Sequence, residues 1–239
     1  MTLEQRIADV LERIEASASR VQRRPSEVTL VAVTKTFGAH VVLEAAEAGV
    51  TDVGENRAQE LREKALVVGD RVRWHFIGPL QTNKAKHVVG TATLIHSVDR
   101  PALATEIDRR ARAHDLVQEV LIEVNVAREA AKQGCDPATA IALAREVDGL
   151  ANVRVRGLMA MAPFSDQPEH SRPYFREMRA LRELLASEVP GATELSMGMT
   201  RDFEVAIEEG ATIVRVGEAI FGPRPRTVRT PDGETLPGV

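Results

Sequence analysis

The stretch VTLVAVTKTFGAHVVLEAAEAGVTDV, residues 28–53, decides the fold because its hydrophobic period changes twice. Residues 28–33 are a near-continuous run of apolar, largely β-branched side chains, which is typical of a strand covered on both faces. Residues 41–48 follow with helical spacing and end at Gly49, and residues 51–53 resume a strand. This stretch therefore predicts a strand, a helix and a second, parallel strand in succession.

The same alternation continues through the rest of the chain. The strand at 51–53 and the five that follow it are predicted at 51–53, 72–77, 93–96, 117–124, 153–159 and 194–195. The helices that follow these six strands are predicted, in the same order, at 58–68, 82–87, 101–114, 137–147, 174–186 and 201–209. A last strand is predicted at 212–216. Alternating units of this number and length predict an α/β fold, a single (β/α)₈ TIM-type barrel over residues 1–224. A doubly wound open sheet is the alternative.

Both ends of the chain lie outside this pattern. Leu3, Ile7, Val10 and Ile14 recur at helical spacing, which predicts an extra amino-terminal helix that ends before Pro25. At the other end, residues 225–239 have no hydrophobic period, which predicts a flexible tail.

Composition excludes several classes of function. The net charge of −4 gives no positive field for a nucleic-acid backbone or an anionic membrane. The chain has one cysteine, Cys135, no signal-peptide pattern and no apolar run that could span a bilayer. Its histidines lack the spacing of metal ligands. We therefore expect a soluble, cytoplasmic protein without a metal site.

Polar residues follow most of the predicted strands, at the end where barrels carry their chemistry. Lys35 comes directly after the first apolar strand, where desolvation favours the neutral amine that forms Schiff bases. The alternative is an ordinary surface lysine. Lys64 lies four residues after Glu60, and this spacing predicts no more than a solvated ion pair.

Two glycine-containing segments predict a phosphate site. Residues 196–200 and the segment that opens at Gly217 follow the last two strands, where barrels usually bind phosphate, although two ordinary turns would have the same sequence. An imine-forming lysine and a phosphate site on one face indicate pyridoxal 5′-phosphate (PLP). Arg215 would then donate to the pyridine nitrogen and keep it unprotonated, or else form an interior salt bridge.

Six sequence motifs carry a resemblance to a known family. They are AVTK at 32–35, GENR at 54–57, HFIGPLQTNK at 75–84, RGLM at 156–159, LSMGM at 195–199, and VRVG at 214–217 with IFG at 220–222. Together they resemble the pyridoxal phosphate homeostasis proteins, also called the PROSC or PLP-binding proteins. The resemblance extends from about Val28 to Arg224.

The resemblance implies a monomeric barrel like the amino-terminal domain of alanine racemase, which holds PLP as a Schiff base on Lys35. It implies these further PLP contacts: Ser196, Gly198 and Gly217 at the phosphate, Arg215 at the pyridine nitrogen, and Asn56, His75 and Met159 around the ring. It also implies a carrier or regulator of the intracellular vitamin B6 pool without robust amino-acid turnover, whose transient partners would be PLP-dependent apoenzymes. The loop 127–134 departs from the family pattern at Arg128 and Glu129, so we assign no PLP-transfer role to Lys132.

Two enzymatic alternatives remain open. A racemase of the alanine racemase type needs a base on each face of the substrate, and this chain has one tyrosine, Tyr174. A Schiff-base aldolase acting on a sugar phosphate without PLP would use Lys35 alone. A yellow purified protein would exclude the aldolase, and steady turnover of an amino acid would exclude a pure carrier.

Overall fold

Eight parallel strands close into a barrel in the computed structural model, which describes residues 1–129, 132–223, 227–229 and 235–237. The strands are β1 Thr29–Val33, β2 Asp52–Glu55, β3 Arg73–Phe76, β4 Leu94–Val98, β5 Gln118–Val124, β6 Val153–Ala160, β7 Glu194–Met199 and β8 Ile213–Val216. The first strand pairs in parallel with the last, with Thr29 opposite Ile213 and Val31 opposite Arg215. The predicted barrel is thus confirmed, and the open-sheet alternative is wrong.

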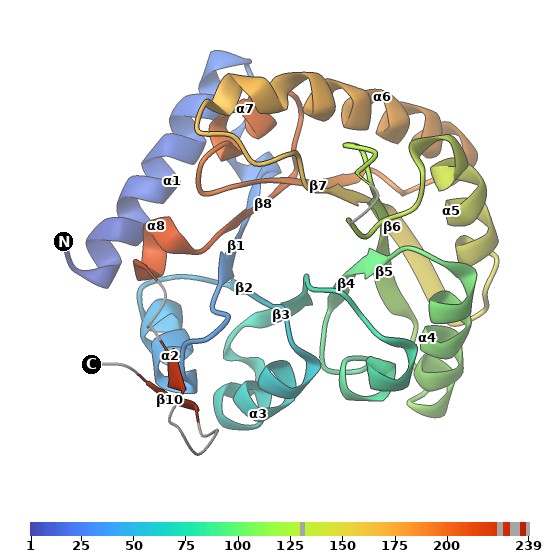
Figure 1. The fold of residues 1–239 in the computed structure, drawn as a ribbon, viewed down its shortest axis with the longest axis horizontal. Coiled ribbons are helices and arrows are strands. Elements are labelled where there is room, and N and C mark those ends of the chain that lie inside the picture. The colour runs from blue at the N-terminus through green and yellow to red at the C-terminus, as the bar shows by residue number, and fades with distance from the viewer. Residues whose placement is uncertain (130–131, 224–226, 230–234, 238–239) are drawn as a thin grey trace.

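Helices surround the barrel (Figure 1). The α-helices are α1 Leu3–Arg20, α2 Ala39–Glu47, α3 Ala58–Val68, α4 Pro101–Ala113, α5 Ala140–Asp148, α6 Arg172–Glu188, α7 Phe203–Glu208 and α8 Glu218–Phe221. The 3₁₀ helices are η1 Pro25–Glu27, η2 Gly69–Arg71, η3 Thr82–His87, η4 Pro137–Thr139 and η5 Pro168–Ser171. The predicted amino-terminal helix is α1. None of the helices in the described part of the chain is long and apolar enough to cross a membrane.

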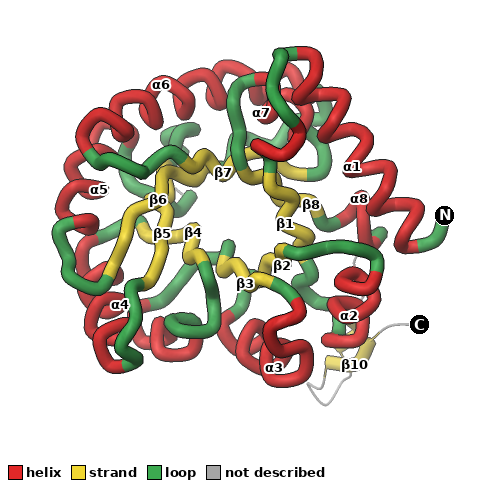
Figure 2. The backbone as a smooth tube through the Cα atoms, turned by 180° about the vertical axis from the view of Figure 1, so that it is seen from behind, coloured by secondary structure: helices red, strands yellow, loops and turns green. Residues whose placement is uncertain are grey.

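Helix α1 is fixed to the outside of the barrel by its apolar face. Ile7, Val10 and Ile14 are buried, and the helix lies beside α7 and α8, as both ribbon views show (Figures 1 and 2). Arg13 also donates to Glu204 of α7, with its Nη2 2.6 Å from Oε1. The extra helix therefore covers the two elements that follow the last strands.

The barrel interior has an apolar layer of its own. Val31, Leu94, Leu121, Met159 and Ile213 form a buried cluster that is separate from the larger core between strands and helices. Because neighbouring strands contribute side chains to this layer, the interior is packed and is not a pore. The polar side chains of the barrel interior lie around this apolar layer.

The main difference from the predicted elements is at β7. Residues 196–199, expected to follow the strand, belong to it, and the ladder to β8 shifts register between Ser196 and Met199. Gly198 has φ +89°, and a Cβ at this position would lie 2.5 Å from the Ala206 side chain of α7. The glycine thus permits a bulge that packs against the following helix.

The predicted flexible tail over 225–239 lies mostly outside the described residues. Of this segment, β9 Thr227–Arg229 and β10 Thr235–Pro237 are described, and they pair as an antiparallel ribbon.

Candidate functional site

A cavity of about 650 Å³ opens at the carboxyl ends of the strands. Lys35 after β1, Asn56 after β2, Arg215 on β8 and Gly217 after it all line this cavity. The structure thus brings four of the eight predicted site residues to one place. The buried Oδ1 of Asn56 has no hydrogen-bond partner among the described residues, so the cavity contains an unused acceptor.

The turn that carries Lys35 is stabilised by a buried ion pair between Lys64 and Glu55. Lys64 donates from Nζ to the carbonyl oxygen of Thr34 at 2.8 Å and to Oε1 of Glu55 at 2.6 Å. The Thr34 hydroxyl donates to the same Glu55 oxygen at 2.5 Å. Burial raises the pKa of Glu55, and Lys64 opposes that rise. The ion pair therefore fixes the backbone directly before Lys35.

Lys64 does not occupy the place expected from its spacing. It is 6% exposed, and its Nζ is 3.6 Å from Glu60 but 2.6 Å from Glu55. The expected pair with Glu60 forms, but the prediction that it is solvated and the only pair is wrong, because Glu55 on β2 lies beneath α3 and pairs more closely with Lys64. Glu60 also accepts from the backbone N–H of Thr36 at 3.0 Å, where the backbone has φ +73°.

Arg215 is nearly buried, with 4% of its surface exposed, and lines the cavity. It donates from Nη1 to Oγ of Ser196 at 2.5 Å and from Nη2 to the carbonyl oxygen of Ala160 at 3.0 Å. Burial lowers the pKa of Arg215 to about 10, with Glu123 opposing that effect. The guanidinium therefore stays charged at neutral pH, and two strands fix its plane.

A chain of hydrogen bonds continues from Arg215 toward the amino ends of the strands. Nδ1 of His96 is 3.0 Å from Oγ of Ser196, and Nε2 of His96 is 2.9 Å from Nδ1 of His75. Nε2 of His75 is 2.9 Å from Oδ1 of Asp52. Burial holds the pKa of His96 well below its usual range, and the charges of His75 and Arg215 lower it further. His96 is therefore neutral.

The Asp52 carboxylate, at the far end of this series of hydrogen bonds, is ionised. Burial alone would raise the pKa of Asp52, but hydrogen bonds from His75 and Arg73 outweigh it and hold the pKa well below the usual range. Arg73 donates to both oxygens, with Nε 2.7 Å from Oδ1 and Nη2 2.6 Å from Oδ2. This series of hydrogen bonds thus connects Arg215 at the cavity with Arg73, an exposed residue at the start of β3.

The other predicted site residues lie below or beside the cavity. His75 and Ser196 belong to the hydrogen-bond chain, and Met159 is packed in the apolar layer of the interior. Gly198 forms the bulge against α7. None of the four is among the described residues that line the cavity.

Sequence reasoning did not single out several lining residues and one buried acid. Among the lining residues are Met161 and Phe164, which follow β6, whereas Thr200 lies within the predicted phosphate segment 196–200. Strand alternation places Met161 two residues after Met159, and this spacing could have identified it. Glu123 is 4% exposed on β5, and burial together with Asp99 raises its pKa to about 7, with Arg215 opposing.

Lys132 also lines the cavity, where its Nζ is 2.8 Å from Oε1 of Glu129. Within the described ranges, no three His, Cys, Asp or Glu side chains are grouped as metal ligands.

Residues 10–225 match the family model described as "Alanine racemase, N-terminal domain". A pyridoxal phosphate homeostasis protein of Aquifex aeolicus is 47% identical over 92% of this chain and 97% of its own length. A second, from Pseudomonas aeruginosa, is 42% identical over 93% and 96%. The chain belongs to the pyridoxal phosphate homeostasis protein family. The family expected from the sequence motifs is thus confirmed.

Solved structures of this homeostasis family share the barrel. PipY of Synechococcus elongatus, solved with PLP bound, superposes with a TM-score of 0.79 at 35% identity, over 92% of this chain and all of PipY. Alanine racemase of Clostridium difficile gives a TM-score of 0.67 at 14% identity, and this chain covers 57% of it. That second likeness shows the fold alone. The pyridoxal phosphate homeostasis proteins match this chain over nearly their full length, whereas the racemase extends well beyond it.

Proposed function

We propose that this protein binds PLP in the cavity at the carboxyl ends of the strands, with its aldehyde carbon bonded to Nζ of Lys35. We further propose that it acts as a carrier or regulator of PLP, not as an amino-acid-converting enzyme. The observation that carries the proposal is the convergence of Lys35, Arg215 and Gly217 on one cavity. PLP presents an aldehyde, a ring nitrogen and a phosphate on different sides of one ring, and these residues match those groups.

The residues present suit each part of PLP. Nζ of Lys35 would condense with the aldehyde and release water, and the unpartnered Oδ1 of Asn56 is an acceptor on the same wall. Thr200 and the backbone at Gly217 lie at the ends of β7 and β8, where barrels usually bind phosphate. Because Ser196 is engaged with Arg215 and His96, we propose that Thr200 supplies the hydroxyl that meets the phosphate.

Arg215 gives the physical reason for storage without turnover. Bound PLP supplies a strong electron sink when its ring nitrogen is protonated and a weak one when that nitrogen is neutral. A guanidinium donates a hydrogen bond and does not deliver a proton at neutral pH, so Arg215 would keep that nitrogen neutral. Ser196 and Ala160 hold the guanidinium in place. His75 then supports Arg215 through His96, and Met159 supports the ring from the layer beneath.

A racemase would also need a second base across the cavity. Tyr174, the single tyrosine, lies on α6 and is packed against the core, away from the described lining. Negligible exchange of the α-hydrogen of alanine or serine in heavy water is therefore expected. Rapid exchange with racemisation would instead establish the racemase alternative.

Borohydride trapping tests the covalent site. Reduction of the protein as purified, followed by peptide mass mapping, should add a pyridoxyl group to the peptide containing Lys35. Lys35→Arg should abolish the label and retain weak, non-covalent PLP. Lys84→Arg, the same change outside the cavity, should leave the label unchanged. A label located mainly on Lys132 in the unmutated protein would contradict the assignment.

A further inference from the structure

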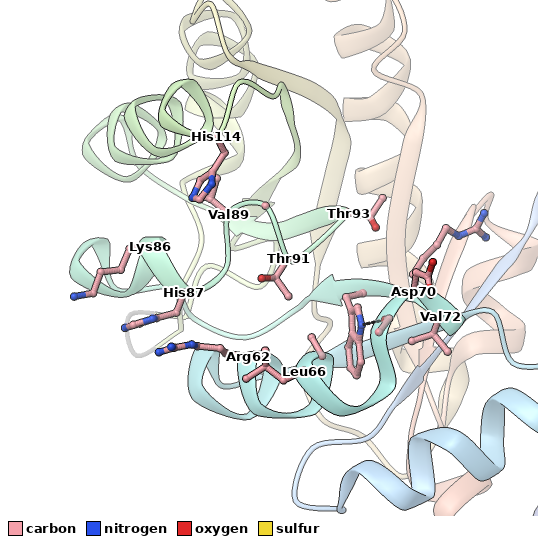
Figure 3. A pocket seen from close by; sticks show the side chains of 15 residues that line it. Arg62, Leu66, Asp70, Val72, Lys86, His87, Val89, Thr91, Thr93 and His114 are labelled. Carbon is pink, nitrogen blue, oxygen red and sulfur yellow. Dashed lines mark hydrogen bonds between the residues drawn. The ribbon is translucent and has the colours of Figure 1, made fainter.

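A second cavity lies at the opposite end of the barrel. Its volume is about 900 Å³, and it opens between α3, η3 and the segments that precede β3 and β4 (Figure 3). Val72 and Thr93 line it just before these two strands begin, whereas Ile77, which follows β3, lines the cavity of Lys35. The two cavities therefore lie at opposite ends of the same strands.

One side of this second cavity is cationic. Arg62 of α3 and Lys86 and His87 of η3 place their nitrogen atoms on the same side, and His114 lies above them (Figure 3). Many arginines of this chain pair with a carboxylate, but no such pair within 4.0 Å occurs for Arg62, Lys86 or His87 among the described residues. Arg62 and Lys86 are thus unneutralised positive charges on a protein whose net charge is −4, and His87, whose pKa is lowered, adds a neutral imidazole beside them.

The positive charges of this side of the cavity act together on His87. Burial lowers the pKa of His87, and the next largest causes are the positive charges of Lys86 and Arg62. Lys84 and Arg110 add smaller effects of the same sign. The neighbouring charges that act most strongly on His87 are thus positive, so an anion at this place would be stabilised.

The other side of the cavity combines the apolar side chains of Leu66, Val72 and Trp74 with the polar side chains of Asp70, Arg73 and Thr93. Trp74 forms part of the wall, and its Nε1 donates to the carbonyl oxygen of Gly69 at 3.2 Å. Leu66 is 80% exposed beside it, and Asp70 lies at the far end from Lys86 and His87 (Figure 3). An exposed leucine and an indole next to a cationic group favour a ligand with an anionic end and a ring.

We propose that this cavity is a second binding site, specific for an organic phosphate that carries a ring, of the nucleotide class. The phosphate would lie against Arg62, Lys86 and His87, and the ring would cover Leu66 and Trp74. Asp70 would accept from an amino or hydroxyl group at the ring end. This site is independent of Lys35 and does not require the proposed PLP function.

Trp74 makes the test direct because it is the only tryptophan in the chain. ADP, inorganic pyrophosphate and adenosine are titrated separately into the protein as purified, and tryptophan emission is recorded. We expect a saturable change with ADP, a weaker one with pyrophosphate, and weaker binding of ADP as salt rises. Binding is repeated by calorimetry, so that absorption by adenine cannot imitate it.

Two sets of variants distinguish binding at this cavity from non-specific attraction of ADP to positive charge. Arg62→Gln combined with Lys86→Gln should weaken ADP binding at least about tenfold, since each loses a charged hydrogen-bond donor. Lys84→Gln removes one charge from the same 3₁₀ helix outside the cavity and should change it much less. Circular dichroism and the thermal midpoint verify that each variant is folded.

Three results would overturn the proposal. They are no saturable response to ADP, an equal loss of affinity in Lys84→Gln, and pyrophosphate binding as tightly as ADP. The last result would show a site for charge alone, without a place for the ring.

Discussion

At the scale of single residues, the buried hydrogen-bond chain has a direction. Arg215 donates to Ser196, which leaves the hydroxyl proton for Nδ1 of His96. When both rings are neutral, His96 then donates from Nε2 to His75, and His75 donates from Nε2 to Asp52. Among the assignments in which both rings are neutral, this is the one that gives every contact a donor and an acceptor.

The first prediction separates the two hydroxyl groups near the phosphate site. Thr200→Val should weaken binding of PLP about ten- to a hundredfold and leave pyridoxal, which lacks the phosphate, unchanged. Ser196→Ala should weaken both ligands by the same factor, because it acts through Arg215. Fluorescence titration measures both affinities. A selective loss of PLP in Ser196→Ala would instead return Ser196 to the phosphate contact predicted from the sequence.

The second prediction concerns the stability of the fold against pH. Burial raises the pKa of Glu123 from 4.5 to about 7, so the folded protein holds a proton there that the unfolded chain releases. The stability that this proton contributes is present below pH 4.5 and is lost as pH rises through 7. The difference corresponds to about 3 kcal/mol of unfolding free energy.

Glu123→Gln should therefore be more stable than the unmutated protein at pH 8, by up to this amount, and equally stable near pH 4. Urea unfolding of both proteins at the two pH values measures the difference. Glu119→Gln changes an exposed acid on the same strand and should show no such dependence. A gain for Glu123→Gln that stays constant with pH would assign the effect to packing alone.

At the scale of elements, the turn after β1 depends on a charge that comes from α3. Removing Lys64 by Lys64→Met leaves Glu55 buried without its partner, which should cost about 3 to 5 kcal/mol of unfolding free energy. Lys84→Met, at an exposed position, should change it by less than about 0.5 kcal/mol. Urea unfolding measures both variants.

The double variant Glu55→Gln with Lys64→Met should recover part of the loss, because no uncompensated charge then remains. If it were as unstable as Lys64→Met alone, the loss would come from packing and not from the ion pair.

The order and type of the helices and strands can be predicted from the period of the hydrophobic residues. The contacts between side chains in the interior cannot be predicted in this way. All eight strands and α1 were predictable from runs of apolar residues bounded by glycine or polar residues. The end of β7 was not, because a glycine in a bulge looks like a turn in the sequence. Lys35, Asn56, Arg215 and Gly217 were predictable because strand ends converge. The neighbours of Lys64 depend on how α3 lies over β2, which local spacing does not encode.

At the scale of the whole molecule, the cavity proposed for PLP joins segments that are distant in sequence. Lys35 and Asn56 come from the first two units, and Thr200 and Arg215 from the last two. PLP at a hundred times its Kd should therefore stabilise the closed barrel by about 2.7 kcal/mol. The thermal midpoint should rise with PLP concentration in a single transition.

Pyridoxine 5′-phosphate, which lacks the aldehyde, should raise the midpoint less than PLP does. In Lys35→Arg the two ligands should become equivalent. Equal effects of both ligands on the unmutated protein would mean that the bond to Lys35 adds nothing to the stability of the fold.

Pairing of β1 with β8 has a consequence for synthesis of the chain. On the ribosome, Thr29 emerges early, but its partner Ile213 emerges only near the end of translation. The nascent barrel thus stays open, with an unpaired edge on β1, until β8 has left the exit tunnel. Arg215 and Gly217 emerge with or just after that strand. The proposed cofactor site is therefore completed by the same event that closes the barrel, and a stalled, shortened chain would expose an edge and lack part of that site.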